Sequence, residues 1–467
     1  MMKLTLGKVK KIAAVSFAAA GLCASAGDRL YKGWWDWGFR PVERTEGDPD
    51  ADCRYYADLS EPMHGPWLTN PTATGITVTW TTRTPCGAAV DWREKGAEEF
   101  TRKWIVRQGA IDYMTKTHTM YLTGLKPGTA YEYRLVAALS PGDYYMTEPF
   151  AAKDVHSFTT MDPQAESCKA FFSSDVHGGF RLMLDAMVER GYGKDAQLYF
   201  LLGDNVEDGM YNDAEYWMTF CFLDDCSRLF AKERPLVAIR GNHDCAGRQA
   251  GLWSEFMPRP DNKAYYTVRQ GPVLFVMIDC FNEWRPTGAQ KENFEQYRRE
   301  MADWLVELKK SDEWKGAAYR VGMCHYGVVE DFCVKWPRET FGEILKDETP
   351  EGRLHLFLCG HTHRHLRKMP HSSDFTTLRQ GGELPKPPKP QIDRKTKQPI
   401  PPRVWTNDYP FAEIELDSHD TVTIEATKEK LQFRAWDWGK PGETVDCYDS
   451  LDITPDGKVT VEAGNAE

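Results

Sequence analysis

The sequence of 467 residues predicts two folded parts, an all-β sandwich followed by an α/β domain. Residues 61–161 contain short segments that alternate polar and apolar side chains, such as 76–80 and 131–135. That period of two is typical of half-buried strands in a two-sheet sandwich. From Lys169 onward, short apolar runs alternate with stretches of helical spacing. Such an order predicts a largely parallel sheet covered by helices.

The first residues have the features of an export signal. Four lysines precede the apolar stretch 12–23, and Ala24-Ser25-Ala26 supplies the small residues that a signal peptidase prefers. About twelve apolar residues are too few to cross a hydrocarbon core that needs roughly 20. We therefore expect residues 1–26 to be cleaved and the protein to be periplasmic, cell-surface or secreted, without a membrane span. A lipid-modified start at Cys23 is the alternative, although Leu22 stands where a small residue would be expected.

Charge and cysteine content narrow the class of partner. Cleavage at residue 26 leaves 54 basic and 69 acidic side chains, a formal charge of −15. Proteins that bind long nucleic acids usually carry a basic surplus, so such a partner is disfavoured. Eleven cysteines remain, and their odd number leaves at least one unpaired within the chain. No CxxC pair occurs in the sequence, which argues against a structural zinc site.

The remaining segments complete the expected organisation. Residues 27–60 form an aromatic N-terminal arm that packs on a later domain or, alternatively, a carbohydrate-binding platform. Residues 166–436 form the α/β domain, in which we expect helices over 182–190, 213–232, 291–310 and 339–346. The proline- and lysine-rich run 384–402 is expected to be an exposed loop or a flap over the active site. Residues 411–416 and 421–426 are interpreted as a closing hairpin, and residues 437–467 as a tail.

Five apolar runs of the α/β domain end in metal-ligating side chains. These side chains are Asp175 and His177, then Asp204, then Asn242 beside His243, then His325, and finally His361 and His363. The loops at the carboxyl ends of strands meet in one crevice of an open α/β sheet, so we expect these tips to converge. Carboxylate, imidazole and amide groups can together hold two metal ions ~3.5–4 Å apart. Asp204 is the natural bridge between them.

The motifs Asp-x-His, Gly-Asp, Gly-Asn-His-Asp, a lone His and Gly-His-x-His, in this order, resemble those of the calcineurin-like metallophosphoesterases. The run 125–133, Leu-Lys-Pro-Gly-Thr-Ala-Tyr-Glu-Tyr, resembles fibronectin type III domains, notably the one that precedes the catalytic domain of purple acid phosphatases. The resemblance implies a four-layer αββα metallophosphoesterase sandwich over 166–436, preceded by a fibronectin type III-like domain over 61–161. It also implies hydrolysis of a phosphate monoester or diester by a metal-bridging hydroxide.

The resemblance further assigns roles to the residues at the strand tips. Asp175, His177 and His363 would hold the first metal, Asn242, His325 and His361 the second, with Asp204 between the two. His243 would face the phosphate as general acid. Iron, manganese and zinc all suit this mixed set of nitrogen and oxygen ligands, so the identity of the metals stays open. Asp244 would either orient His243 or cap a turn.

Two departures from relatives refine the expectation. Glu207 stands where purple acid phosphatases have the tyrosine that binds iron and gives the colour, so we expect a colourless enzyme. Ser174 replaces a glycine that is common before the first aspartate. The leading hypothesis is an exported phosphoesterase acting on a small phosphorylated substrate. The alternatives are a surface binding module on a silent phosphoesterase core, and a nuclease, which the acidic charge disfavours.

Overall fold

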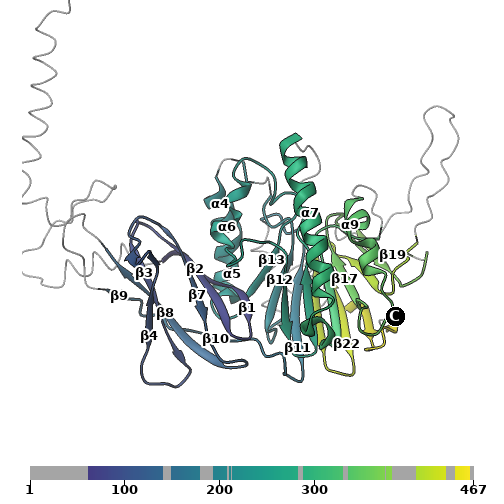
Figure 1. The fold of residues 1–467 in the computed structure, drawn as a ribbon, viewed down its shortest axis with the longest axis horizontal. Coiled ribbons are helices and arrows are strands. Elements are labelled where there is room, and N and C mark those ends of the chain that lie inside the picture. Colours follow the sequence, from purple (N-terminus) through teal and green to yellow (C-terminus); the bar gives the residue numbers. More distant parts are fainter. Residues whose placement is uncertain are drawn as a thin grey trace, which may run out of the picture.

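The computed structural model describes residues 62–139, 149–178, 193–207, 210–211, 213–281, 288–329, 335–373, 375–380, 406–437 and 447–462. The predicted signal peptide, the N-terminal arm, the helix over 182–190 and the run 384–402 lie outside these residues. Figure 1 shows a β domain at one end of the molecule and a larger domain of helices and sheets at the other.

The N-terminal domain consists of two antiparallel sheets packed face to face and a two-stranded ribbon formed by β5 and β6. One sheet has the strand order β1-β2-β7, and the other has the order β10-β8-β3-β4 with β9 beside β8. The strands are β1 Pro62–Thr72, β2 Gly75–Thr82, β3 Gly87–Glu94, β4 Thr101–Trp104, β5 Val106–Arg107, β6 Ala110–Ile111, β7 Thr117–Thr123, β8 Ala130–Ala138, β9 Phe150–Ala151 and β10 His156–Thr159. The alternating apolar side chains, Trp80 and Tyr133 among them, fill the space between the sheets. The predicted all-β sandwich is therefore confirmed.

Strand β1 attaches this domain to the catalytic part of the chain (Figure 1). The buried Trp67 donates its indole N–H to the carbonyl of Phe256 over 2.8 Å. The Ser227 hydroxyl donates to the carbonyl of Pro66, and the Tyr133 hydroxyl donates to that of Lys232, each over 2.8 Å. Because these donors lie at a buried junction, their hydrogen bonds fix how the two domains meet.

Two seven-stranded sheets form the centre of the catalytic domain. The first has the order β13-β12-β11-β21-β22-β23-β24, and the second β14-β15-β16-β17-β20-β18-β19. The strands of the first are β11 Cys168–Ser173, β12 Leu198–Leu202, β13 Leu236–Ile239, β21 Asp420–Ala426, β22 Leu431–Asp437, β23 Cys447–Ile453 and β24 Val459–Val461. Those of the second are β14 Tyr266–Gln270, β15 Val273–Met277, β16 Tyr319–Met323, β17 Leu356–Cys359, β18 Arg364–Lys368, β19 Phe375–Gln380 and β20 Ala412–Glu415.

The sheets pack directly on each other, and helices cover their outer faces. Phe275 of the second sheet meets Phe200 of the first with ring centroids 4.6 Å apart. The helical elements are α4 Ala214–Met218, η1 Thr219–Leu223, α5 Asp224–Cys226, η2 Ser227–Ala231, η3 Ala250–Leu252, α6 Trp253–Phe256, α7 Gly288–Leu308, α8 Asp312–Lys315 and α9 Trp336–Leu345. One apolar cluster packs the helices from α4 to α6 on the first sheet. Another packs the helices from α7 to α9 on the second sheet. This arrangement confirms the predicted four-layer αββα sandwich.

The observed helices follow local sequence signals. Asp213 caps α4 by accepting a hydrogen bond from the backbone N–H of Tyr216, as expected for an acid at that position. Leu305 and Leu308 of α7 lie in the core, as their helical spacing predicts. Within the described part of the chain, no helix is long and apolar enough to cross a membrane.

The segment after residue 411 differs from the prediction in two ways. Strands β20 and β21 do not form a hairpin, because β20 pairs with β17 and β18 while β21 pairs with β11 and β22. A tight turn, in which Asp420 donates its backbone N–H to the carbonyl of Asp417, carries the chain from one sheet to the other. The expected tail also contributes strands β23 and β24 to the first sheet.

Strand register brings the polar tips to one edge of the sandwich. Ser173 pairs with Leu201 in the parallel ladder of β11 and β12, and Leu202 pairs with Ile239 in that of β12 and β13. In the second sheet Met323 pairs with Leu358. Five loops therefore leave their strands at the same level, and the side chains that follow can meet.

Candidate metal centre

Five of the predicted site residues have left-handed backbone conformations, with φ between +49° and +78°. They are Asp175, His177, Asp204, His361 and His363. Such conformations are uncommon for residues other than glycine, and they concentrate at functional sites. The backbone strain shows that the loops are held in shape by their neighbours rather than by local preference.

The glycines of the motifs allow these loops to approach each other closely. A Cβ atom on Gly241 would lie 2.2 Å from the backbone nitrogen of Asp204, and one on Gly360 would lie 2.2 Å from Asp175 Oδ2. Both distances are far below van der Waals contact. The absence of a side chain at these two positions therefore sets the distance between the tips.

One group of ligand-type atoms comes from the first and last tips. The ligand atoms of Asp175, His177 and His363 all lie within 4.8 Å of one another. His363 Nε2 is 3.6 Å from Asp175 Oδ1 and 3.2 Å from His177 Nε2. Asp175 is buried, and its carboxylate accepts hydrogen bonds from the Ser174 hydroxyl (2.6 Å) and the His361 backbone N–H (2.9 Å).

A second group lies beside the first, and Asp204 links the two because it also groups with His177. Asp204, His325 and His361 lie within 4.8 Å of one another. Asp204 Oδ2 is 3.2 Å from His325 Nε2 and 3.9 Å from His177 Nε2, so this carboxylate reaches both groups. His325 donates its Nδ1–H to the carbonyl of Leu202 over 2.8 Å. That bond turns Nε2 toward the cluster, as a backbone carbonyl does when it accepts from the other ring nitrogen of a metal-binding histidine.

Unpaired atoms in this cluster suit a metal pair. Among the described residues, the buried Asn242 Oδ1 has no hydrogen-bond partner, and the buried His325 Nε2 faces the carboxylate of Asp204 over 3.2 Å. A buried polar atom without a partner costs free energy unless a ligand satisfies it. Imidazole nitrogens with carboxylate and amide oxygens are suitable ligands for first-row transition metals. The residues present therefore fit two such ions.

Electrostatics of the cluster follow from burial and mutual charge. Burial lowers the pKa of His361 to about 3, with the charge of His325 acting in the same direction, so His361 is neutral and able to ligate. Burial opposes the charged form of His325, but the carboxylates of Asp204 and Asp175 outweigh it and raise the pKa of His325 to about 10. Positive charge is therefore strongly favoured between these two carboxylates.

His243 and Asp244 point in different directions. The His243 side chain is 40% exposed, and its Nε2 lies 3.9 Å from Asp204 Oδ2 at the edge of the cluster. Its Nδ1 contacts the backbone carbonyl of Glu207. The carboxylate of Asp244 is buried and accepts from the backbone N–H groups of Gly241 (2.7 Å), Asn205 (3.1 Å) and Val206 (3.2 Å). Of the two roles considered for Asp244, these contacts are those of a turn cap.

Sequence reasoning missed a buried ionic network behind the last tip. The Thr362 hydroxyl donates to Glu415 Oε2 over 2.7 Å. Lys368 Nζ lies between Glu415 and Glu413, 2.8 Å from the latter, and all three side chains are buried. A lysine and two glutamates on neighbouring strands carry no local signal of partnership, because the pairing of β18 with β20 becomes visible only in the fold.

His355 and His365 do not belong to the site. His355 is buried and accepts a hydrogen bond from the Arg320 backbone N–H over 3.2 Å, as expected for a core histidine. His365 is also buried, with its ring nitrogens 2.6 Å from Asp420 and 2.8 Å from Asp449. None of the nine described cysteines forms a disulfide.

Comparison with known proteins agrees with the fold. Residues 169–365 match the calcineurin-like phosphoesterase family, and residues 65–160 match the N-terminal domain of purple acid phosphatases. The protein is therefore a metal-dependent phosphoesterase by class. More particularly, the chain carries a purple acid phosphatase N-terminal domain followed in the sequence by a calcineurin-like phosphoesterase domain, as the motifs predicted. A search of curated proteins found no significant match.

Two solved structures share the fold at low sequence identity. The purple acid phosphatase PPD1 from yellow lupin (Lupinus luteus) seeds is 15% identical, with a TM-score of 0.52 over 83% of this chain and 74% of that one. PhoD is 11% identical, with a TM-score of 0.54 over 87% of this chain and 93% of that one. At this identity the likeness concerns the fold alone.

Proposed function

We propose that the protein is an exported phosphoesterase that hydrolyses small phosphate monoesters or diesters at a two-metal centre. The carrying observation is the convergence of two groups of ligand-type atoms, both of which Asp204 reaches through His177 and His325. Asp175, His177 and His363 would hold one ion, and Asn242, His325 and His361 the other, with Asp204 between them. When bound, the two ions supply the nucleophile near neutral pH and polarise the phosphoryl oxygens. Iron, manganese and zinc are the candidate metals.

The chain itself contributes a proton and a rigid frame. His243 is exposed at the rim of the cluster, and its backbone N–H donates to Asp204 Oδ1 over 2.9 Å. That bond ties the position of the histidine to the bridging carboxylate. His243 then protonates the departing alkoxide as general acid, a role worth roughly 10²- to 10⁴-fold in rate.

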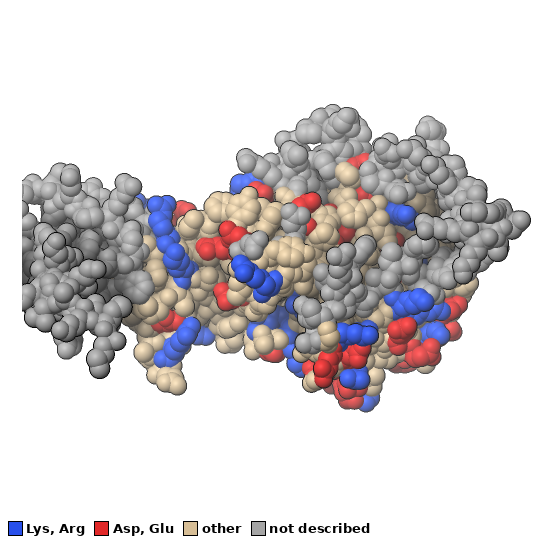
Figure 2. Space-filling view, turned by 90° about the horizontal axis from the view of Figure 1, so that it is seen from above, with Lys and Arg blue, Asp and Glu red and all other residues tan. Residues whose placement is uncertain are grey.

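Surface charge supports a small substrate rather than a long nucleic acid. The full chain has a formal charge of −11. On the face shown in Figure 2, the described Lys and Arg side chains stand interspersed with Asp and Glu side chains. Tight binding of a nucleic acid backbone needs several cations aligned along it.

Export is supported by the lysines and the apolar stretch that precede residue 26.

Hydrolysis of two chromogenic esters tests the proposal. Mature protein reconstituted with manganese, zinc or iron is assayed with p-nitrophenyl phosphate and with bis-p-nitrophenyl phosphate. We expect turnover of at least one ester, a loss of 10²-fold or more in His243→Ala, and no loss in His371→Ala, whose side chain is 52% exposed. Two bound metals without turnover of either ester would favour the surface binding module instead.

A further inference from the structure

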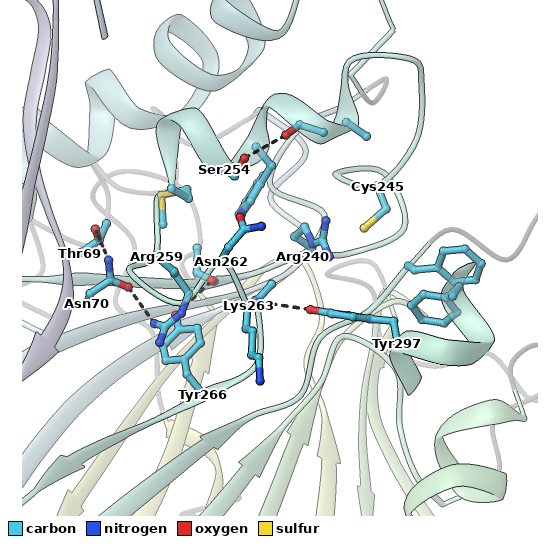
Figure 3. A pocket seen from close by; sticks show the side chains of 18 of the residues that line it. Thr69, Asn70, Arg240, Cys245, Ser254, Arg259, Asn262, Lys263, Tyr266 and Tyr297 are labelled. Carbon is cyan, nitrogen blue, oxygen red and sulfur yellow. Dashed lines mark hydrogen bonds between the residues drawn. The ribbon is translucent and has the colours of Figure 1, made fainter. Parts of the chain in front are cut away.

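A second cavity lies at the junction of the two domains. Its volume is about 470 Å³, within the range of pockets that take small ligands. Figure 3 places Thr69 and Asn70 of β1 at one side of this junction pocket and Tyr297 of α7 at the other. Arg240, Asn262 and further polar side chains lie between them. Domain junctions are a preferred location for ligand sites, because two rigid bodies together enclose the space.

The lining of the junction pocket is basic. Arg240, Arg259 and Lys263 line it, and among the described residues no Asp or Glu does. The charge of Arg240 is compensated by Asp279, whose Oδ1 accepts from Arg240 Nε over 3.0 Å. The remaining cations are Lys263 and Arg259, and the Nε of Arg259 lies 3.3 Å from the partly exposed carboxylate of Asp261.

Arg259 is held in place for binding. Its Nη1 donates to Asn70 Oδ1 over 2.8 Å, and its guanidinium lies 3.6 Å from the centroid of the Tyr266 ring. Its Nε is buried without a hydrogen-bond partner, and the neighbouring carboxylate of Asp261 is 3.3 Å away and 48% exposed. An exposed carboxylate contributes little to an ion pair. A ligand anion can pair with this guanidinium at a small cost in conformational entropy, because the position of the Arg259 side chain is already fixed.

Aromatic side chains form the rest of the wall. The lining includes Trp253, Tyr266, Phe281, Phe294 and Tyr297. Flat rings such as these bind a planar ligand by stacking and by edge-to-face contact. A planar group among the rings and an anionic group at the cations would together use both features of the lining.

We propose that the junction pocket binds a small organic anion that carries a planar ring. The site is separate from the metal centre, although Arg240 and Cys245 of its wall lie on either side of the turn Gly241 to Asp244. None of the residues assigned to the metals lines it. The inference stands independently of the hydrolytic function, since it rests on other side chains.

Calorimetric titration of metal-loaded protein with naphthalene-2-sulfonate tests the proposal, because this probe has a ring and a charge but no ester to cleave. We expect one site per chain. Naphthalene-2-sulfonamide, which has the ring without the charge, should bind at least tenfold more weakly. Methanesulfonate, which has the charge without the ring, should show no measurable heat of binding.

Variants locate the probe. Lys263→Glu reverses an exposed cation and should weaken binding at least tenfold, whereas Lys310→Glu, an exposed lysine of the same kind outside the pocket, should not. Gly251→Leu should abolish binding, since a Cβ at Gly251 meets no atom within 4 Å and the leucine would extend into the open pocket. Asp204→Asn should retain binding.

Three results would overturn the proposal. One is the absence of saturable binding to the wild-type protein. Another is unchanged affinity in Lys263→Glu, which retains its fold because the side chain is exposed. The third is loss of binding in Asp204→Asn, which would place the probe in the metal cleft.

Discussion

Replacing Asp244 by asparagine should destabilise the catalytic domain strongly, although the two side chains have the same shape. Asp244 Oδ2 accepts from Gly241 N–H (2.7 Å) and from the Asn205 side-chain amide (3.0 Å), and Oδ1 accepts from the backbone of Asn205 and Val206. Whichever way the new amide is turned, its NH₂ group faces two buried donors. Leaving each donor unsatisfied costs roughly 1 to 3 kcal/mol, so we expect a loss of about 2 to 6 kcal/mol.

The measurement is the free energy of unfolding from denaturant titration at pH 8. That pH is chosen because burial, with the charge of Asp204 adding to it, raises the pKa of Asp244 to about 7, and the carboxylate predominates above it. Asp213→Asn is the matched control, since asparagine caps helix α4 about as well as aspartate does. A loss within about 0.5 kcal/mol in both variants would refute the reasoning.

Three further predictions follow from other parts of the structure. Gly360→Ala should lower the amount of bound metal severalfold, because the new Cβ would lie 2.2 Å from Asp175 Oδ2. Elemental analysis measures the metal. Gly251→Ala should leave the metal content unchanged, because its Cβ meets no atom within 4 Å. In the folded protein, burial lowers the pKa of His118 to about 4 from its ordinary value of 6.5. As the pH falls from 6.5 to 4, His118 therefore takes up a proton in the unfolded chain but not in the folded protein. The free energy of unfolding should therefore drop by about 3 kcal/mol more in the wild type than in His118→Gln over that window, and equal drops would contradict this. Iron-loaded protein should show no tyrosinate-to-iron absorption band in a visible spectrum, because Glu207 stands at the tyrosine position of the purple enzymes; a purple protein would disprove it.

The five strand tips could be predicted from the sequence because each combines two strong signals. An apolar run such as residues 198–202 is too short for a helix, and glycine with a polar residue ends it; the structure has β12 at Leu198–Leu202. Parallel strands in one sheet place such ends at one edge. The prediction that Asp175 lies close to His363, 188 residues later, therefore needed only the class of the sheet. It needed no knowledge of a long-range contact.

The β20–β21 hairpin was wrong for a physical reason. Both strands alternate polar and apolar side chains, yet all residues of β20 and nearly all of β21 are buried, so the pattern identifies two strands without indicating which sheet each one joins. Because the two strands are close in the sequence, a hairpin was the natural prediction. In the fold, β20 lies between β17 and β18 of the second sheet, and β21 lies between β11 and β22 of the first. The buried Glu413 and Glu415 of β20 could not be interpreted either, because their partner Lys368 comes from β18.

Local conformation at the site was also beyond sequence reasoning. Asp175, Asp204 and His361 have positive φ, which their residue types do not indicate. Neighbouring loops impose these angles through backbone bonds, such as His177 N–H to the carbonyl of Asp204 over 3.0 Å. The role of Asp244 as a cap depends on the same arrangement, since two of its donors come from the loop after β12.

Metal stoichiometry tests the central claim most directly. Mature protein is reconstituted with excess manganese, zinc or iron, freed of unbound ions, and measured by elemental analysis beside Asp204→Asn. We predict close to two ions per chain in the wild type and a clear loss in the variant, since Asp204 reaches both groups of ligand-type atoms. No bound metal in the wild type, or an unchanged content in Asp204→Asn, would contradict a two-metal centre at these residues.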